Sequence, residues 1–218
     1  MSTENQSVCA VVVAVIVAAG SSRRMGGENK LLLPLCGKPV LAHTLTAFQM
    51  CGAVRDIVLV CREQDMEVYR TLAAENGITK LRTLTRGGDT RTESVLAGVS
   101  AASEACALVA VHDGARPLVS DEVITQAVAE AAKTGAAAPV VPVKDSIKRI
   151  ENGKIAADVP RDTLAAVQTP QVFRRDMLLH ALLDAAANGR SFTDDCAAVE
   201  ALGQTVSATS GSYENIKV

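Results

Sequence analysis

Aromatic side chains, excess positive charge and long apolar runs are all scarce in this sequence of 218 residues. It has no tryptophan, two tyrosines and three phenylalanines, and its formal net charge is −2. Proteins that bind nucleic acid generally need a basic face and often stacking aromatics, so the composition argues against a nucleic-acid partner. Any cationic site in this protein must therefore be local.

The longest apolar run, residues 8–19, is too short for a membrane span. A spanning helix needs about 20 apolar residues, so the run is typical of a buried strand. Its flank, MSTENQS, lacks the basic residues of a secretory signal. The six cysteines form no C-x-x-C pair, and the three histidines form no zinc pattern. Most cysteines lie in apolar segments, where a reduced thiol acts as a small hydrophobe, so we expect a cytoplasmic protein. The short apolar run leads us to expect no membrane partner.

Strand-like and helix-like segments alternate along most of the chain. Continuous apolar runs predict strands at 11–17, 56–61, 107–111, 137–143 and 205–208. Apolar spacing and caps predict helices at 39–50, 66–75, 92–102, from Ser120 to Gly135, at 177–187, and from 193–195 to Gly203. We also expect 165–173 to return to the core and 215–218 to begin a strand. This alternation predicts a doubly wound, mainly parallel α/β sheet, whose ligands bind at the carboxyl ends of the strands.

The segment SIKRIENGKIAADV, residues 146–159, breaks this alternation. It is typical of a β-hairpin with Asn152 and Gly153 at its turn. Because the faces of the hairpin are partly polar, we expect it to project from the rest of the protein. The sequence therefore predicts one domain over residues 1–218, with 144–163 as a projecting β-arm.

The stretch AAGSSRRMGGENK, residues 18–30, follows the first predicted strand. Gly20 allows a turn that brings main-chain N–H groups near a ligand. Arg23 and Arg24 can chelate phosphate oxygens, and Lys30 adds a point charge. The glycine patterns of dinucleotide folds and of the phosphate loop are both absent. The stretch favours an anion site of another kind, and a solvated basic loop is the alternative.

Two further strand ends carry polar motifs. In RGGDTRTESV, residues 86–95, Gly87 and Gly88 permit an unusual main-chain path that can expose amides to a base edge or a sugar. An ordinary loop and helix cap is the alternative. In HDGARP, residues 112–117, Asp113 stands where α/β proteins often contact a metal or sugar hydroxyls, with Arg116 to compensate its charge. A structural Asp–Arg pair that holds a turn is the alternative there.

Eight motifs, in order and with fitting separations, tie these segments together: AAGSSRRMG, NKLLLPLCGKPVL, GGDTRTESV, VHDGARP, VKDSIKR, QTPQVF, FTDD and ENIKV. They resemble the 2-C-methyl-D-erythritol 4-phosphate cytidylyltransferase family of the non-mevalonate isoprenoid pathway, from about residue 9 to the end. The resemblance implies a Rossmann-like nucleotidyltransferase fold. It also implies that CTP and methylerythritol phosphate give CDP-methylerythritol and pyrophosphate. The anion at the basic stretch would then be the CTP triphosphate, with Mg²⁺ bridging phosphate oxygens.

The same resemblance implies a role for each matching residue. Arg24 and Lys30 would grip the triphosphate and the reacting phosphate, with Lys217 as a further catalytic group. The nucleotide would be held by the main chain of Ala18, Ala19 and Gly20 and by Gly88, Asp89 and Ser94. The acceptor would be held by Asp113, Arg116, Ser146, Arg161, Thr169 and Thr193, with Asp113 also a candidate metal ligand.

In this family the hairpin is a dimer arm, which implies a homodimer in which Arg161 reaches the neighbouring subunit's site. Three features depart from the family pattern. Asn29 replaces the usual proline before Lys30 and leaves that loop less rigid, and Ser146 replaces a frequent threonine but keeps the hydroxyl. The sequence also stops at Val218, so we expect the final helix of the family to be absent.

Two alternative functions stay open. A pentitol-phosphate cytidylyltransferase would use the same fold and leaving group, although HDGARP and VKDSIKR favour methylerythritol phosphate. A non-catalytic nucleotide-binding protein is the second alternative. Such a protein would have no physical need to keep the charges of Arg24, Lys30, Asp113 and Lys217.

Overall fold

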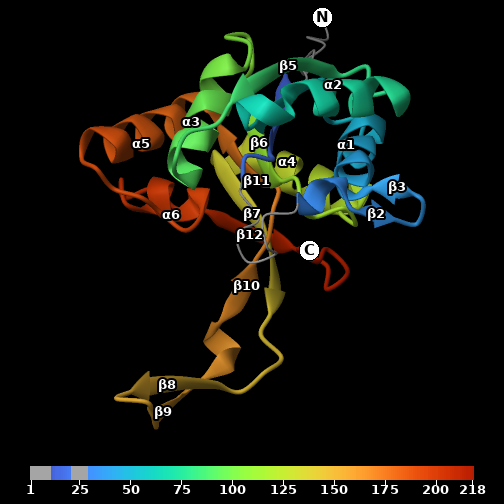
Figure 1. Ribbon diagram of the computed structural model, residues 1–218. Coiled ribbons are helices and arrows are strands. Elements are labelled where there is room, and N and C mark those ends of the chain that lie inside the picture. The colour runs from blue at the N-terminus through green and yellow to red at the C-terminus, as the bar shows by residue number, and fades with distance from the viewer. Residues whose placement is uncertain (1–10, 21–28) are drawn as a thin grey trace, which may run out of the picture.

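A mixed, mainly parallel sheet forms the centre of the protein (Figure 1). The computed structural model describes residues 11–20 and 29–218. The strand order is β10-β7-β11-β6-β1-β4-β5, and β12 pairs with β7. The strands are β1 (Val12–Val17), β4 (Asp56–Cys61), β5 (Leu81–Arg86), β6 (Leu108–Asp113), β7 (Ala136–Pro142), β10 (Ala165–Val167), β11 (Gln171–Arg174) and β12 (Ser207–Ser210). Because β1, β4, β5 and β6 run parallel while β10 and β11 run antiparallel to β7, the predicted fold class is confirmed.

Helices cover both faces of this sheet (Figure 1). One face carries α1 (Val40–Met50), α2 (Met66–Glu75) and α4 (Asp121–Thr134), and the other carries α3 (Arg91–Ala101), α5 (Arg175–Ala187) and α6 (Asp195–Glu200). The side chains of β1 alternate between the two cores: Val12, Ala14 and Ile16 join the first, and Val13 and Val15 join the second. A strand buried on both faces has no solvent side, which explains the continuous apolar run in the sequence.

Most predicted helices and strands are confirmed with small shifts of their ends, but three segments differ. The strand β5 was not predicted, because it is the last strand of the sheet and is only partly buried. The segment 165–173 was expected in the core, yet it splits into the exposed β10 and the buried start of β11. Residues 215–218 form no strand, because their main chain bonds to turns, as Val218 N–H does to the carbonyl of Ala115 at 2.9 Å.

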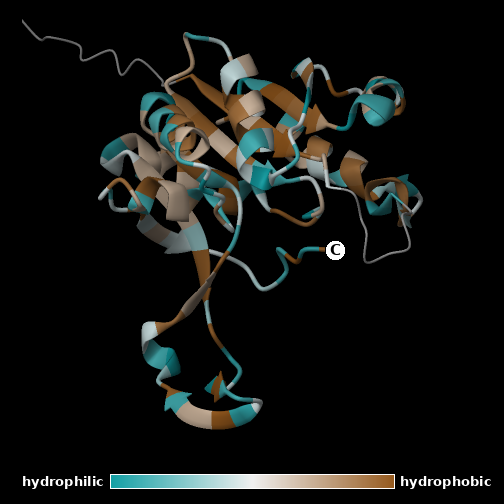
Figure 2. Cartoon of the chain, turned by 60° about the vertical axis from the view of Figure 1, so that its left-hand side comes forward, coloured by the Kyte–Doolittle hydropathy of each residue, from teal (hydrophilic) through white to brown (hydrophobic). Residues whose placement is uncertain are grey.

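The predicted hairpin forms a separate two-stranded ribbon of β8 (Ile147–Glu151) and β9 (Lys154–Val159). Its turn lies at Asn152 (φ 51°) and Gly153 (φ 74°), which confirms the predicted two-residue turn. The ribbon extends away from the sheet beyond the ends of β7 and β10, to which residues 143–146 and 160–164 connect it (Figure 1). Apolar segments occur along it (Figure 2), and the side chains of Ile150 and Ile155 are 59% and 70% exposed.

The cysteines of the described residues are free, and all except Cys36 are buried. Burial raises the pKa of the Cys61 thiol to about 11, so this thiol stays protonated and acts as a small apolar group. Within the same described residues, no helix combines the length and the apolarity that crossing a bilayer requires.

Candidate active site

A cavity of about 1200 Å³ lies where the parallel strands β1, β4, β5 and β6 end. Each of these strands contributes the residues that follow it, and the last residues of the chain close the cavity. The lining consists of residues 17–20, 30–31, 62–64, 86–91, 94, 113, 115 and 217–218. The carboxyl ends of parallel strands meet at one edge of a sheet, so this is where the predicted site was expected.

Positive charge gathers in the lining, although the whole chain has a net charge of −2. The basic residues of the lining are Lys30, Arg62, Arg86, Arg91 and Lys217, and the acidic ones are Glu63, Asp89 and Asp113. Helix α3 also begins at the lining, with Thr90 as its N-cap. The positive end of its dipole adds to the field of the cations. The cavity is therefore suited to a multiply charged anion.

Asp113 lies at the end of β6 among three cations. Its Oδ2 accepts a hydrogen bond from Lys217 Nζ at 2.8 Å and lies 3.6 Å from Arg116 Nε, and its Oδ1 lies 3.8 Å from Arg91 Nη2. Burial by itself raises the pKa of this carboxyl, but Lys217 and Arg91 outweigh burial and hold the pKa below its ordinary value. Asp113 is therefore ionised at neutral pH and anchors the surrounding cations.

Arg91 connects Asp113 to a second, buried carboxylate. Its Nη1 donates to Asp195 Oδ1 at 2.8 Å, and Asp195 is 1% exposed. Burial lowers the pKa of Arg91, but Asp195 and Asp113 reverse the shift and raise it. Sequence reasoning did not select Arg91. The available signal was a cation in the first turn of a helix, where the dipole disfavours positive charge unless a carboxylate compensates it.

Lys30 reaches the site through a hydrogen-bonded turn. Asn29 caps the short 3₁₀ helix η2 (Lys30–Leu32), since its Oδ1 accepts from Leu31 N–H at 3.2 Å. The Asn29 amide also donates to the hydroxyl of the fully buried Tyr69 at 2.9 Å. Lys30 Nζ donates to the main-chain oxygen of Val218. The Asn29 side chain therefore holds the start of η2 by two hydrogen bonds. The expected lower rigidity of the loop before it stays a prediction, since residues 21–28 lie outside the described residues.

Close packing explains the two glycines before α3. A Cβ on Gly87 would lie 2.6 Å from Ala19 Cβ, and one on Gly88 would lie 2.3 Å from Glu93 Cβ. Glu93 Oε2 accepts from the main-chain N–H groups of Asp89 at 2.7 Å and Thr90 at 3.1 Å. The Thr90 amide belongs to the capping box of α3 and the Asp89 amide bonds to the same carboxylate, so neither of these two amides is exposed in the way that the sequence predicted for a base edge or a sugar.

Nine of the predicted site residues line the cavity: Ala18, Ala19, Gly20, Lys30, Gly88, Asp89, Ser94, Asp113 and Lys217. The Ala18 N–H is already used, since it donates to the Val60 carbonyl at 2.7 Å. Arg24 lies outside the described residues. Arg62 and Arg86 line the cavity but were not predicted, and only the position of Arg86 beside the double glycine could have indicated it.

The other predicted residues do not line this cavity. Arg161 lines a second cavity of about 720 Å³ at the base of the ribbon, Ser146 directly precedes β8, and Thr193 lies before α6. Arg116 donates to the main-chain oxygen of Asn215 at 2.6 Å. Thr169 is 4% exposed, and its hydroxyl bonds inside the protein.

The predicted metal ligand Asp113 does not fit that role in this arrangement. Both of its carboxylate oxygens face cations, from Lys217, Arg116 and Arg91. Across the part of the chain that the structure describes, no cluster of histidine, cysteine and acidic residues could hold a metal ion. The described side chains alone therefore form no metal site.

Comparisons with known proteins agree with one another. The family model described as IspD, 2-C-methyl-D-erythritol 4-phosphate cytidylyltransferase, matches residues 12–218. A protein of Bacillus licheniformis with that same enzyme name is 44% identical over 205 residues, which are 94% of this chain and 88% of the relative. A 4-diphosphocytidyl-2C-methyl-D-erythritol synthase from Anaerococcus prevotii has a similar structure, with a TM-score of 0.87 and 27% identity over 96% of this chain and 91% of its own. The cytidylyltransferase of Thermus thermophilus has a TM-score of 0.77 and 30% identity over 95% of this chain and 92% of its own.

Proposed function

We propose that cytidylyl transfer takes place in the cavity at the ends of β1, β4, β5 and β6. The chain belongs to the 2-C-methyl-D-erythritol 4-phosphate cytidylyltransferase family. It transfers a cytidylyl group from CTP to 2-C-methyl-D-erythritol 4-phosphate in isoprenoid biosynthesis. One observation carries this assignment. Lys30 and Lys217 come from opposite ends of the sequence, and the fold brings both to one cationic cavity beside Asp113.

The reaction needs positioning and charge more than it needs a protein nucleophile. An oxygen of the acceptor phosphate forms a bond to the α-phosphorus of CTP. The bond from that phosphorus to the bridging oxygen breaks, and its electron pair leaves with pyrophosphate. The acceptor phosphate is already ionised at neutral pH, so no general base is required. Lys30 and Lys217 then stabilise the charge that develops on the transferred group and on pyrophosphate.

The nucleotide half of the cavity is formed by the loops after β1 and β5. We assign CTP to Ala19 and Gly20 on one side and to Gly88, Asp89 and Ser94 on the other, because these residues line the cavity together. Ala18 would contact the nucleotide through its side chain or carbonyl. Arg24 remains a proposed ligand of the triphosphate. Ionised Asp113 would hold Lys217 in place and accept from acceptor hydroxyls.

We propose that Mg²⁺ arrives as part of the CTP complex, held mainly by phosphate oxygens and water, as is usual for this ion. When bound, it would neutralise charge on the triphosphate. The buried, free thiols and the nucleotide substrate support a cytoplasmic location.

The contact predicted for Arg161 belongs to a proposed homodimer. The arm carries exposed Ile150 and Ile155, and a lone two-stranded ribbon is marginal in water, so a second subunit would cover it. Arg161 lines a different cavity from Lys30, which supports its use in the partner's site. Ser146 and Thr193 stay proposed contacts of the acceptor or its phosphate.

The test is pyrophosphate release by the purified protein with CTP and each of two acceptors. We expect turnover with 2-C-methyl-D-erythritol 4-phosphate and little with ribitol 5-phosphate. Comparable rates with ribitol 5-phosphate would favour the pentitol-phosphate alternative. Binding of CTP without turnover of either acceptor would favour the non-catalytic one.

A further inference from the structure

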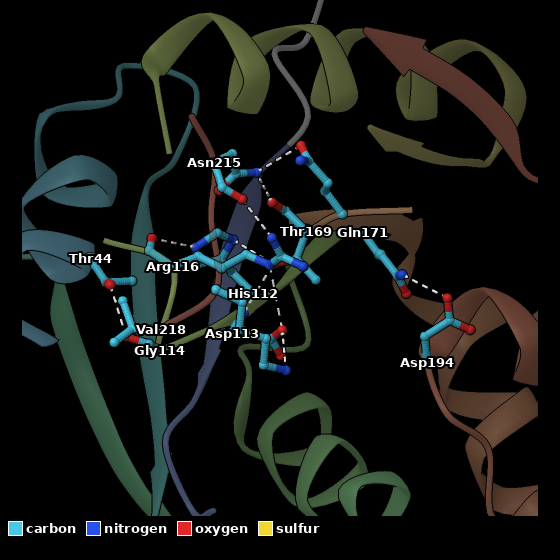
Figure 3. A network of polar contacts seen from close by, with 12 residues as sticks. Thr44, His112, Asp113, Gly114, Arg116, Thr169, Gln171, Asp194, Asn215 and Val218 are labelled. Carbon is cyan, nitrogen blue, oxygen red and sulfur yellow. Dashed lines mark hydrogen bonds and ion pairs between the residues drawn. The ribbon is translucent and has the colours of Figure 1, made fainter. Parts of the chain in front are cut away.

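A closed ring of hydrogen bonds lies beside Asp113 (Figure 3), the carboxylate that accepts from Lys217. Its members are His112, Arg116, Thr169 and Asn215, which come from β6 and the turn after it, from the segment before β11, and from the end of the chain. His112 and Asn215 are fully buried, and Thr169 is 4% exposed. The ring joins three segments that are far apart in the sequence.

The first half of the ring fixes the tautomer of His112. Its Nε2 lies 3.2 Å from the carbonyl of Arg116, which can only accept, so Nε2 carries the proton. Its Nδ1 is then an acceptor, and the Thr169 hydroxyl donates a hydrogen bond to it at 2.9 Å. The Thr169 oxygen in turn accepts from the main-chain N–H of Asp113 at 3.2 Å. Burial lowers the pKa of His112 to about 4, so this neutral arrangement persists at neutral pH.

The second half closes through Asn215. Its side-chain Nδ2 donates to the main-chain carbonyl of Thr169 at 2.9 Å. The main-chain carbonyl of Asn215 accepts from Arg116 Nη1 at 2.6 Å. Every link runs between buried or half-buried groups, where hydrogen bonds are strong and loss of one partner is costly. The ring therefore fixes Asn215 relative to the end of β6, where Asp113 lies.

A second clamp holds the approach to this segment. Gln168 Oε1 accepts from Asn215 Nδ2 at 3.2 Å and from Ser212 N–H at 3.2 Å, and its Nε2 donates to the Ser212 carbonyl at 2.8 Å. Beyond Lys217, Val218 N–H donates to the Ala115 carbonyl at 2.9 Å. The backbone that carries Lys217 has no helix or strand of its own, so the side-chain bonds of Gln168 and the main-chain bond of Val218 fix it.

The Asn215 amide works through its nitrogen. Its Oδ1 is buried without a hydrogen-bond partner among the described residues. Its Nδ2 donates to the Thr169 carbonyl, which closes the ring, and to Gln168 Oε1. An apolar side chain at this position would leave both of these acceptors unpaired.

We propose that Asn215 is a positioning residue, which acts through the ring with Thr169, His112 and Arg116 to hold Lys217 against Asp113 for cytidylyl transfer. The inference rests on the proposed catalytic role of Lys217. It also gives Thr169 a different task from the predicted contact with substrate, because its hydroxyl proton is donated to His112 and its oxygen accepts from the main-chain N–H of Asp113.

A double-mutant cycle tests this inference. We would measure pyrophosphate release by wild type, Asn215→Ala, Lys217→Ala and the double variant. If Asn215 acts through Lys217, Asn215→Ala lowers kcat about tenfold or more in the native sequence but less than about twofold in the Lys217→Ala background. The KM for CTP stays within about twofold, because the nucleotide loops lie outside the ring.

The matched control is Ile216→Ala, the neighbouring side chain, which is 52% exposed and lies outside the ring. It should match wild type. Equal losses from Asn215→Ala in both backgrounds would overturn the positioning role. Wild-type turnover by Lys217→Ala would instead overturn the proposed function of Lys217 itself.

A milder variant covers the case in which Asn215→Ala does not fold. Gln168→Ala loosens the same segment but leaves the ring closed, and it should show the same dependence on Lys217. If Gln168→Ala also unfolds, as judged by circular dichroism, these bonds serve global stability and the positioning role is wrong. Folded Gln168→Ala with independent losses would contradict it equally.

Discussion

The strands β1 and β9 have the same length, six residues, but opposite surroundings. β1 pairs with a neighbour on both edges and is buried on both faces. Among the residues that the structure describes, β9 pairs only with β8, and most of its own residues are exposed. A strand like β1 can place the groups at its end with precision, because its whole backbone is fixed. The stability of a strand like β9 depends on a surface that covers its exposed side chains. The sheet is therefore suited to holding a reactive site, and the arm is suited to association with another surface.

The sharpest test on the sheet side is Lys30→Ala. Lys30 begins a short turn at the cavity, so its removal should change the free energy of unfolding by no more than about 0.5 kcal/mol. The loss of a charge that acts on the transition state should cost roughly 3 kcal/mol or more, about a hundredfold in kcat. Urea unfolding and pyrophosphate release measure the two effects. Unchanged turnover would place the chemistry elsewhere.

His112 lies on the central strand β6, and its burial should make the free energy of unfolding of the protein depend on pH. The arm contains no histidine and should add no such dependence. Its pKa falls from 6.5 to about 4 on burial, so only the unfolded chain is protonated between these values. Stability should be constant above about pH 6.5 and decline by about 3 kcal/mol as the pH falls to 4.

The comparison is with His112→Gln, which cannot titrate. Carboxylates titrate in both proteins, so the difference in their urea midpoints isolates the histidine. The variant should be less stable than wild type at pH 7 and lose less stability on acidification. Parallel curves for the two proteins would contradict the assignment of a neutral, buried His112.

Mixed dimers test whether the arm completes a site. Arg161→Ala and Lys30→Ala subunits should each be nearly inactive alone. If Arg161 acts in the partner's site, a mixed dimer has one site with both defects and one with neither. Random exchange then makes half of the dimers mixed, so about a quarter of wild-type activity should return. Absence of recovery after confirmed subunit exchange would confine Arg161 to its own subunit.

The smallest expected effect is on thermal stability after metal removal. The described residues offer no cluster that could hold a metal ion, so EDTA should leave the melting temperature of the CTP-free protein within about 1 °C. Turnover should stop, since the proposed Mg²⁺ comes with CTP. A lower melting temperature in EDTA without nucleotide would reveal a resident ion.

The fold was predictable where burial is complete on both faces. β1 and β4 are continuous apolar runs, and no helix of so few residues competes with that pattern. β5 was missed because its burial is incomplete. As the last strand of the sheet it is only partly buried, and LRTLTR has no clear period.

The site was predictable at the strand ends and not beyond them. Asp113 ends the buried strand β6, so its place at the carboxyl edge of the sheet follows from topology. Gly88 follows the partly buried β5, and only its glycine motif indicated it. The bonds of Thr169 to His112 and of Arg91 to Asp195 join residues far apart in sequence. No local pattern encodes such tertiary contacts, so the hydroxyl of Thr169 looked available to substrate when it was already engaged.

The long-range pairing of β1 also bears on the order of folding. Val17 pairs with Asp113, whereas in the arm Ile150 pairs with Ile155 across a tight turn. Closing a long loop is slow, and a hairpin forms in about 1–10 μs. The ribbon can thus form transiently long before the sheet is complete. During synthesis the cavity cannot form until β6, near the middle of the sequence, has been made and has paired with β1.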